Sequence, residues 1–274
     1  MFFRSHKPLP PLASCVDYYW YLSHVPNHER ERIVPSGTLE IVINLHEDEI
    51  RIYDLADPRK FTSYSGTVVS GAHRGYFVVD TRAHASIIGV HFSPGGAFPL
   101  LGVPPGSLMD KHVDLAAIWG TRAAHLRERL CVARDLDERF QILGDELTRR
   151  LNSAVHSRDE VKFAIRQLMR TNARVSQVAA AVELSHRRLI EIFTAEVGIA
   201  PKVFSRVQRL QRALALAKQE ASPDWTQVAA TCGYFDQPHL IRESILLSGL
   251  SPKELLRGSA DVKVHHAALA QHQG

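Results

Sequence analysis

Two short stretches in the C-terminal part of the sequence carry side chains that can hydrogen-bond to the edges of nucleic-acid bases. The first runs from His186 to Glu191, and the second runs from Gln237 to Arg242, about 50 residues later. Arginine can donate two hydrogen bonds to guanine, glutamine can pair with adenine, and glutamate can accept from the amino group of cytosine. Because this chemistry occurs twice in similar surroundings, the sequence predicts a duplicated unit that contacts DNA.

The first stretch lies in a predicted pair of short helices joined by a tight turn. Ser176 is the expected N-cap of a helix that runs to Ala181, and Ser185 is expected to cap the second helix. Gly198 is expected to end the second helix, since glycine readily adopts the left-handed conformation found there. The residues expected on the buried face are Val178, Ala179, Leu189, Ile192, Phe193 and Val197. This is the outline of a helix-turn-helix unit.

The second stretch repeats the arrangement. Asp224 is expected to cap a helix that runs to Thr231, and Asp236 is expected to cap the next helix, with Pro238 in its first turn. Gly249 is expected to end that helix. The residues expected to face the core are Val228, Ala229, Leu240 and Ile241.

Residues 201–218 are predicted to form one long helix between the two units. Its apolar stripe consists of Val203, Val207, Leu210, Leu214 and Ala217. Its basic residues meet no acidic residue between Glu196 and Glu220 in the sequence. A rigid connector would let two recognition helices enter adjacent major-groove segments, about 34 Å apart on one face of DNA.

Residues from about 160 to 257 resemble the DNA-binding domain of the AraC/XylS family of transcription regulators. The residues that carry the resemblance are Val178, Ala179, Leu184, Ser185, Leu189, Phe193, Gly198 and Pro201, then Arg209, Leu210 and Ala213, then Val228, Ala229, Gly233, Tyr234, Asp236, Gln237, Pro238, His239, Leu240, Arg242, Gly249, Leu250, Ser251 and Pro252. They follow one another in the family's order over the whole length of that domain.

The resemblance implies which residues contact DNA. The implied base contacts are Arg187, Ile190 and Glu191 in the first unit, and Gln237, His239 and Arg242 in the second. The implied phosphate contacts are Ser185, His186, Arg188, Lys202, Arg206 and Lys253, together with the helix N-termini at Pro201 and Pro252.

The sequence departs from the family pattern at several positions. Residues 245–247, Ile-Leu-Leu, replace a basic stretch. Glu191 stands where many members have arginine, and Ser244 and Ser248 stand where the second unit usually has apolar residues. Buried serines at these positions are expected to leave a cavity or an unsatisfied hydroxyl, which would cost about 2–4 kcal/mol. The second unit is therefore either a second reading unit or a structural one that grips phosphate weakly.

The first half of the sequence reads as short strands followed by helices. Strands are predicted at residues 37–45, 50–53, 67–70, 76–79 and 86–92. From about residue 111 the apolar pattern is helical, with a break at Arg134 and Asp135. The predicted fold class is α+β: an N-terminal β-barrel or sandwich-like domain with following helices, and an all-α C-terminal domain.

The predicted domains differ in charge. Residues 1–154 form the β-rich sensor or dimerisation domain, with 17 Lys and Arg against 18 Asp and Glu. Residues 155–258 form the DNA-binding domain, with 15 against 10, and residues 259–274 form a disordered tail. This asymmetry is typical of a chain in which one domain meets a polyanion.

The N-terminal domain resembles β-rich regulatory domains that are fused to many AraC/XylS members. The resemblance lies in residues 34–44, 89–97 and 101–104. If this domain encloses an effector pocket, the expected lining residues are Glu40, Asn44, His91 and Phe92. The alternative is that these are ordinary strand residues without a ligand.

Other functional classes have little support in the sequence. The three cysteines are far apart, no signal peptide or run of 18 apolar residues is present, and a cytoplasmic protein is expected. His-x-His, Gly-x-Ser-x-Gly and phosphate-loop patterns are absent, so neither an enzyme, a cofactor nor a metal is predicted. A cupin-like metal enzyme and a protein-interaction module with degenerate DNA binding are the alternatives. Double-stranded DNA, a small-molecule effector, a second copy of the chain and RNA polymerase are the expected partners.

Overall fold

The N-terminal part of the chain folds into two β-sheets. The computed structural model describes residues 2–23, 30–81, 85–153, 155–170, 172–257 and 262–263. The six-stranded sheet has the order β1 (Phe2–His6), β2 (Val16–Ser23), β9 (Ser86–Phe92), β4 (Glu40–Asn44), β7 (Thr67–Ser70) and β10 (His112–Asp114). The five-stranded sheet has the order β11 (Val262–Lys263), β3 (Arg30–Ile33), β8 (Phe77–Asp80), β5 (Ile50–Tyr53) and β6 (Phe61–Tyr64).

The two sheets form a sandwich. Among the described strands, β1 and β10 stand at the open edges of one sheet, and β11 and β6 stand at the edges of the other. The predicted α+β class and the sandwich are therefore confirmed, and the closed barrel offered beside the sandwich is wrong.

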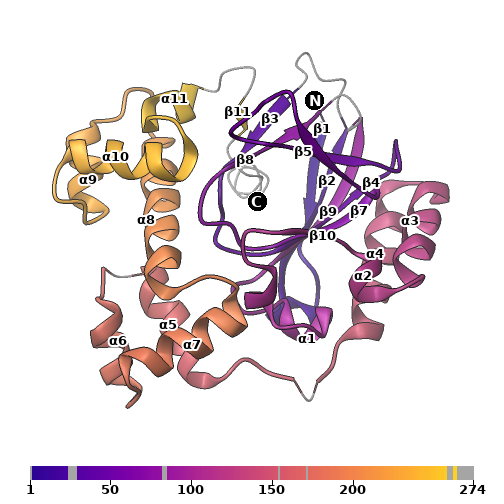
Figure 1. Cartoon of the computed structure of the whole chain (residues 1–274), viewed down its shortest axis with the longest axis horizontal. Helices are drawn as coiled ribbons and strands as arrows, with labels where there is room; N and C mark the ends of the chain where they lie inside the picture. Colours follow the sequence, from indigo (N-terminus) through magenta and orange to yellow (C-terminus); the bar gives the residue numbers. More distant parts are fainter. Residues whose placement is uncertain are drawn as a thin grey trace.

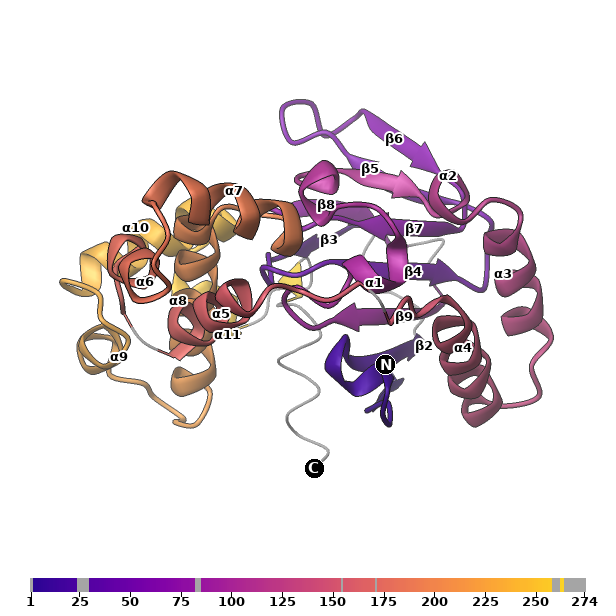
Figure 2. The same cartoon turned by 90° about the horizontal axis from the view of Figure 1, so that it is seen from below.

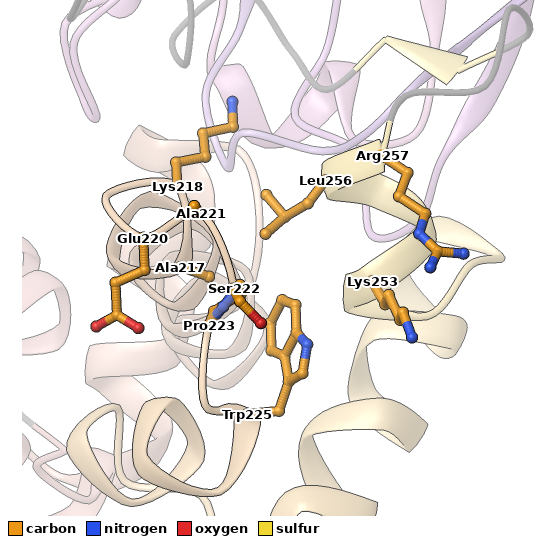
Figure 3. Close-up of a pocket in the computed structure, with 10 residues that line it drawn as sticks. All are labelled: Ala217, Lys218, Glu220, Ala221, Ser222, Pro223, Trp225, Lys253, Leu256 and Arg257. Carbon is orange, nitrogen blue, oxygen red and sulfur yellow. The ribbon is translucent and has the colours of Figure 1, made fainter.

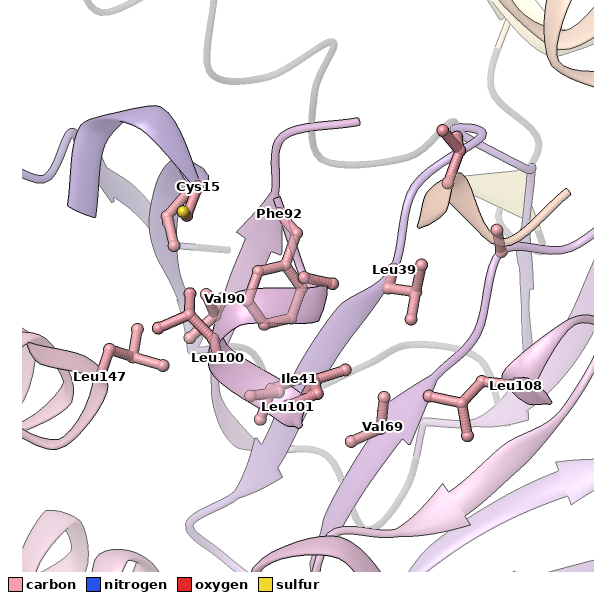
Figure 4. Close-up of a cluster of buried hydrophobic side chains, with 14 of the residues drawn as sticks. Cys15, Leu39, Ile41, Val69, Val90, Phe92, Leu100, Leu101, Leu108 and Leu147 are labelled. Atoms are coloured by element: carbon pink, nitrogen blue, oxygen red, sulfur yellow. The ribbon is translucent and has the colours of Figure 1, made fainter. Parts of the chain in front are cut away.

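Strand β4 shows why the sheets are layered in this way. Ile41 and Ile43 point to one face, where they join a core with the helices that follow the sheets, and Val42 points to the other face and packs near Trp20. This is the alternation that the sequence predicts. Figure 4 shows the helix-covered face, where Ile41 lies near Leu101.

Several strands were not predicted, because their sequences show no alternation of apolar and polar residues. Five of the eight residues of β2 are buried, and they lie on both faces of the strand. The segment VDYYWYLS therefore has no polar face that would reveal a strand in the sequence. Strands β1, β3, β6 and β10 are short edge or near-edge strands with many polar residues, which give no apolar pattern either.

Helices cover the six-stranded sheet at one side. They are α1 (Phe98–Leu101), α2 (Ala116–Trp119), α3 (Arg122–Val132) and α4 (Leu136–Arg150). The predicted break between the two longer helices is confirmed, because the side chain of Asp135 caps α4 by accepting the N–H of Glu138 at 2.8 Å.

Seven helices follow at the other side of the sheets (Figures 1 and 2). They are α5 (Asp159–Arg170), α6 (Val175–Ala181), α7 (His186–Val197), α8 (Pro201–Ala217), α9 (Trp225–Thr231), α10 (Gln237–Ser248) and α11 (Pro252–Arg257). The predicted tail is corrected at one place: Val262 and Lys263 form β11 beside β3. The other tail residues lie outside the described residues.

The helical domain is packed directly against the sheets. One continuous apolar core contains Ile41 of β4 together with Phe193 of α7 and Phe204 of α8. Gly198, at φ +101°, lies so close that an added Cβ would be 3.1 Å from both Ala72 and Leu39. The side chains of α8 add polar contacts to the loop before β4.

Hydrogen bonds made by α8 and by β3 help to fix the helical domain to the sheet domain. Gln208 and Gln211 of α8 donate to the carbonyl oxygens of Ser36 and Pro35, each at 2.8 Å. Arg32 of β3 donates to the carbonyl of Ser248 at the end of α10, at 3.0 Å. These bonds therefore attach the sheet domain to the connector helix α8 and to the second helix-turn-helix unit.

The buried serines of α10 are satisfied, which corrects the expectation of an orphaned hydroxyl. Ser244 Oγ donates to the carbonyl of Leu250 at 2.7 Å. Ser248 Oγ lies 2.7 Å from the Ser244 carbonyl and accepts the N–H of Leu250 at 3.2 Å. The two hydroxyls tie the loop after α10 back onto the helix, so these serines give no reason to consider the second unit degenerate.

We therefore predict that Ser248→Ala lowers the free energy of unfolding by about 1–2 kcal/mol, because it leaves the part-buried N–H of Leu250 without its acceptor. The measurement is urea unfolding followed by circular dichroism. The control is Ser222→Ala in the exposed α8–α9 loop, for which a change within about 0.5 kcal/mol is expected. A Ser248→Ala variant as stable as the wild type would contradict the satisfied network.

Candidate nucleic-acid interface

The first helix-turn-helix unit consists of α6 and α7. The N-cap of α6 is Arg174, not Ser176 as the sequence suggested, and its N–H donates to Gln177 Oε1 at 2.9 Å. Gln177, the third residue of the helix, accepts the N–H of the N-cap residue and so fixes the helix start one residue before Ser176. Glu183, at φ +54°, forms the turn in the left-handed conformation.

Helix α7 begins and ends as predicted. Ser185 Oγ accepts the N–H of Arg188 at 3.1 Å, and Gly198 follows the last turn in the left-handed conformation. The buried face contains Leu189, Ile192, Phe193 and Val197, which confirms the predicted core. The implied base contacts are left on the outer face.

Glu191 holds two arginines on this outer face. Its Oε1 lies 3.0 Å from Arg187 Nε, and its Oε2 lies 3.5 Å from Arg188 Nη1. The hydrogen bond from Arg187 holds the pKa of the Glu191 carboxyl below its usual range, so the carboxylate stays ionised. An acid at this position therefore offsets part of the positive charge that would meet DNA.

The second unit consists of α9 and α10. Asp224 caps α9, and Asp236 caps α10 by accepting the N–H of His239 at 2.7 Å, as predicted. The Thr226 hydroxyl donates to Gln237 Oε1 at 3.2 Å, which brings the starts of the two helices together. One core assignment is wrong: Ile241 is half-exposed, since the buried positions of α10 are Leu240, Ser244, Leu247 and Ser248.

A groove of about 690 Å³ joins the two units. It is lined by Asn172, Ala173, Arg174, Val175, Ser176, His186, Ile190, Ala200, Pro201, Lys202, Ser205, Arg206, Arg209, His239 and Glu243. Predicted DNA contacts of both units thus line one groove, together with residues of α8. The N-terminus of α8 opens into the groove, and its N-cap Ala200 makes no side-chain cap, so its N–H groups are available to a phosphate.

Two of the implied phosphate contacts have other partners. Arg206 Nε lies 2.7 Å from Glu243 Oε1, and both side chains are mostly buried between α8 and α10. This pair also places Glu243 against α8. Arg206 therefore fixes α10 on the connector helix. The sequence shows no acidic residue near Arg206, but its partner Glu243 lies 37 residues further along the chain.

The helix start at Pro252 is also occupied. Glu254 Oε2 accepts the N–H of Ser251 at 2.7 Å and the hydroxyl of Ser251 at 2.6 Å. The carboxylate of Glu254 thus occupies the start of α11, where a DNA phosphate was predicted to bind. Lys253 is exposed and lines a separate pocket of about 540 Å³ with Trp225 and Arg257, away from the groove (Figure 3).

The histidine of the second unit has a defined tautomer. The N–H of Phe235 donates to His239 Nδ1 at 3.3 Å, so Nε2 carries the proton and can donate to DNA. Phe235 itself is 91% exposed and was not among the candidates from the sequence. An apolar residue directly before the helix cap was the available signal, because that position normally packs against the first turns of the helix.

The four residues predicted to line an effector pocket do not surround one cavity. Glu40 and His91 are joined, with 2.5 Å between Oε1 and Nδ1, and His91 Nε2 lies 3.1 Å from Thr38 Oγ1. Glu40 lines a cavity of about 70 Å³ between the sheets, whereas His91 lines one of about 480 Å³ between the sheets and α8.

Asn44 and Phe92 have structural positions instead. Asn44 Oδ1 accepts the N–H groups of His46 and Glu47, which shapes the turn after β4. Phe92 is fully buried in the apolar core on the other face of the sheet (Figure 4). Alternation along the strands could not separate a pocket wall from a core wall, since both faces of this sheet are buried.

No group of three or more His, Cys, Asp or Glu side chains that could hold a metal ion occurs within the described residues. His73 and His112 stack with 4.6 Å between ring centroids, and burial lowers their pKa values to about 4 and about 3. None of the described helices is both long and apolar enough to cross a bilayer.

Two protein families match parts of the chain. A family model described as a helix-turn-helix domain matches residues 178–258, and one described as a domain of unknown function (DUF6597) matches residues 4–114. No curated protein matches the chain.

Solved structures of ToxT from Vibrio cholerae are similar in fold. A 1.65 Å structure has a TM-score of 0.49 at 10% identity, covering 93% of this chain and 98% of that one. An unsaturated fatty acid-bound structure of wild-type ToxT from strain SCE256 has a TM-score of 0.47 at 9% identity, covering 93% and 94%. The family matches show that this chain carries a helix-turn-helix domain of the AraC type over residues 178–258, behind a domain of unknown function over residues 4–114.

Proposed function

We propose that this chain is a sequence-specific transcription regulator whose two helix-turn-helix units occupy adjacent major-groove segments of one DNA site. The observation that carries the proposal is the groove between α7, α8 and α10, because side chains from both units line it. Between two major-groove segments the sugar–phosphate backbone must cross the protein. The groove offers Lys202, Arg209 and the open N-terminus of α8 at that place.

In this proposal, Arg187, Ile190 and Glu191 of α7 read one segment, and Gln237, His239 and Arg242 of α10 read the other. Ser185, His186, Arg188 and Lys202 hold phosphates around the first unit. Arg206 and Lys253, which the sequence placed in the same group, have the positions described above and are left out of it.

We also propose that the sheet domain controls the placement of the two units. Gln208 and Gln211 attach α8 to the loop before β4, and Arg32 attaches the end of α10 to β3. A small-molecule effector or a second copy of the chain that altered this contact would change the angle at which α10 meets DNA. Recruitment or obstruction of RNA polymerase would then follow from the position of the bound protein, and no catalytic step is part of the proposal.

The first test is Arg187→Ala. We expect this variant to bind a DNA site selected from random duplexes more weakly by about 1–3 kcal/mol, because one bidentate base contact is lost. The measurement is fluorescence anisotropy from 50 to 300 mM salt. Arg59→Ala is the matched control, since the side chains of Arg59 and Arg187 are 90% and 91% exposed and Arg59 lies in the sheet domain. Equal binding of all sequences by wild type and variant would contradict the proposal.

The second test is Glu191→Gln. We expect its affinity for non-specific DNA to rise about three- to tenfold at 50 mM salt, because a negative charge is removed and Arg187 and Arg188 are released. Since the pKa of Glu191 is lowered, its carboxylate is ionised throughout the range from pH 6 to 8, and the gain should be the same at both ends.

Glu128→Gln, at an exposed position of α3, is the control for the charge change and should leave the affinity unaltered. An unchanged non-specific affinity of Glu191→Gln would place Glu191 away from the DNA surface.

A further inference from the structure

Phe235 is the most exposed large apolar side chain of the described residues, at 91% of its surface. It follows Tyr234, which is buried, and precedes Asp236, the cap of α10. Leaving a whole phenylalanine ring in water forgoes the free energy that burial would give it. The ring is therefore accessible to a partner outside the chain.

The fold itself does not use this ring. An apolar residue directly before an N-cap usually packs against the fourth residue of the helix, which is Leu240 here. Leu240 is completely buried, yet Phe235 is exposed, so the two do not make that contact. Tyr234 fills the core at this turn instead. Stability therefore gives no reason for a phenylalanine at position 235.

The ring stands at the edge of the proposed DNA surface. The backbone N–H of Phe235 bonds His239, and His239 lines the groove shared by the two units. Gln237 and Arg242, the other predicted base contacts of α10, belong to the same helix.

The outer face of α10 differs chemically from that of α7. Beyond Arg242 it exposes Ile245 and Leu246, whereas α7 exposes Arg187 and Arg188. The second unit is thus suited to apolar contact and the first to charged contact.

We propose that Phe235 reads DNA by packing its ring against the C5-methyl group of a thymine in the major groove of the second half-site. This inference rests on the proposed DNA-binding function and names part of its specificity. Thymine is the only base that presents a methyl group in the major groove, and phenylalanine is among the side chains that contact it. Because Gln237 is suited to adenine, the second half-site would contain A·T pairs near the start of α10.

The test combines a change in the protein with a change in the DNA. Each thymine of a site selected from random duplexes is replaced in turn by uracil, which removes only the methyl group. We expect one replacement to weaken wild-type binding about fourfold, the value that corresponds to one buried methyl group. Phe235→Ala should weaken binding to the thymine site by at least the same factor and should lose the sensitivity to that uracil. The measurement is fluorescence anisotropy at one fixed salt concentration.

Phe61→Ala is the matched control, because Phe61 is 46% exposed on β6 of the sheet domain and should alter neither value. Circular dichroism and the salt dependence of binding, both expected to be unchanged in Phe235→Ala, show that the variant is folded. If Phe235→Ala keeps the full affinity, or keeps the sensitivity to every uracil, the inference is overturned. In that case selective binding that depends on Arg187 would leave the proposed function standing, whereas loss of selectivity in the wild type would remove both.

Discussion

The burial of α8 is the constraint on which the arrangement of this protein depends. Phe204, near its start, belongs to the core that α8 shares with the first unit and the sheets, and Val207, Leu210 and Leu214 belong to the core of the second unit. A single straight helix therefore takes part in both hydrophobic cores. The two recognition helices cannot change their separation without exposing one of these cores, so packing, and not the DNA, would set the spacing of the proposed DNA contacts.

Two sets of ion pairs act in addition to this hydrophobic packing. The Arg206–Glu243 pair fixes α10 on α8 inside the protein, where it is partly withdrawn from water, and the Glu191 pairs hold two arginines at the surface. The first pair limits how far the second unit can rotate on the connector. In the proposed complex with DNA, the second would reduce the general attraction to DNA and leave a larger share of the binding energy to contacts that depend on sequence.

The sequence predicted the elements with a clear period and clear caps, such as α7 with Ser185 and Gly198, and α10 with Asp236 and Gly249. It missed β2, because a strand buried on both faces has no alternation. It also misplaced the cap of α6, because Gln177 accepts the N–H of Arg174 and the helix begins before Ser176. The hydrogen-bond partners of Arg206, Ser244 and Ser248 lie beyond turns or on other helices. The local sequence pattern therefore could not predict these contacts. Asn44 and Phe92 were predicted to line a pocket because the alternation along a strand shows which residues share a face, but not whether that face borders a cavity or a packed core.

The central claim is that α8 holds the two units at one fixed spacing on one continuous DNA site. The most direct measurement is the affinity for the selected site after five base pairs are inserted between its two halves, which turns one half by about half a helical turn. A rigid connector predicts that binding falls to the level of non-specific DNA, and that a ten-base-pair insertion does not restore it. Binding of either insertion site as tightly as the original would contradict the account, because it would show that the units move independently of α8.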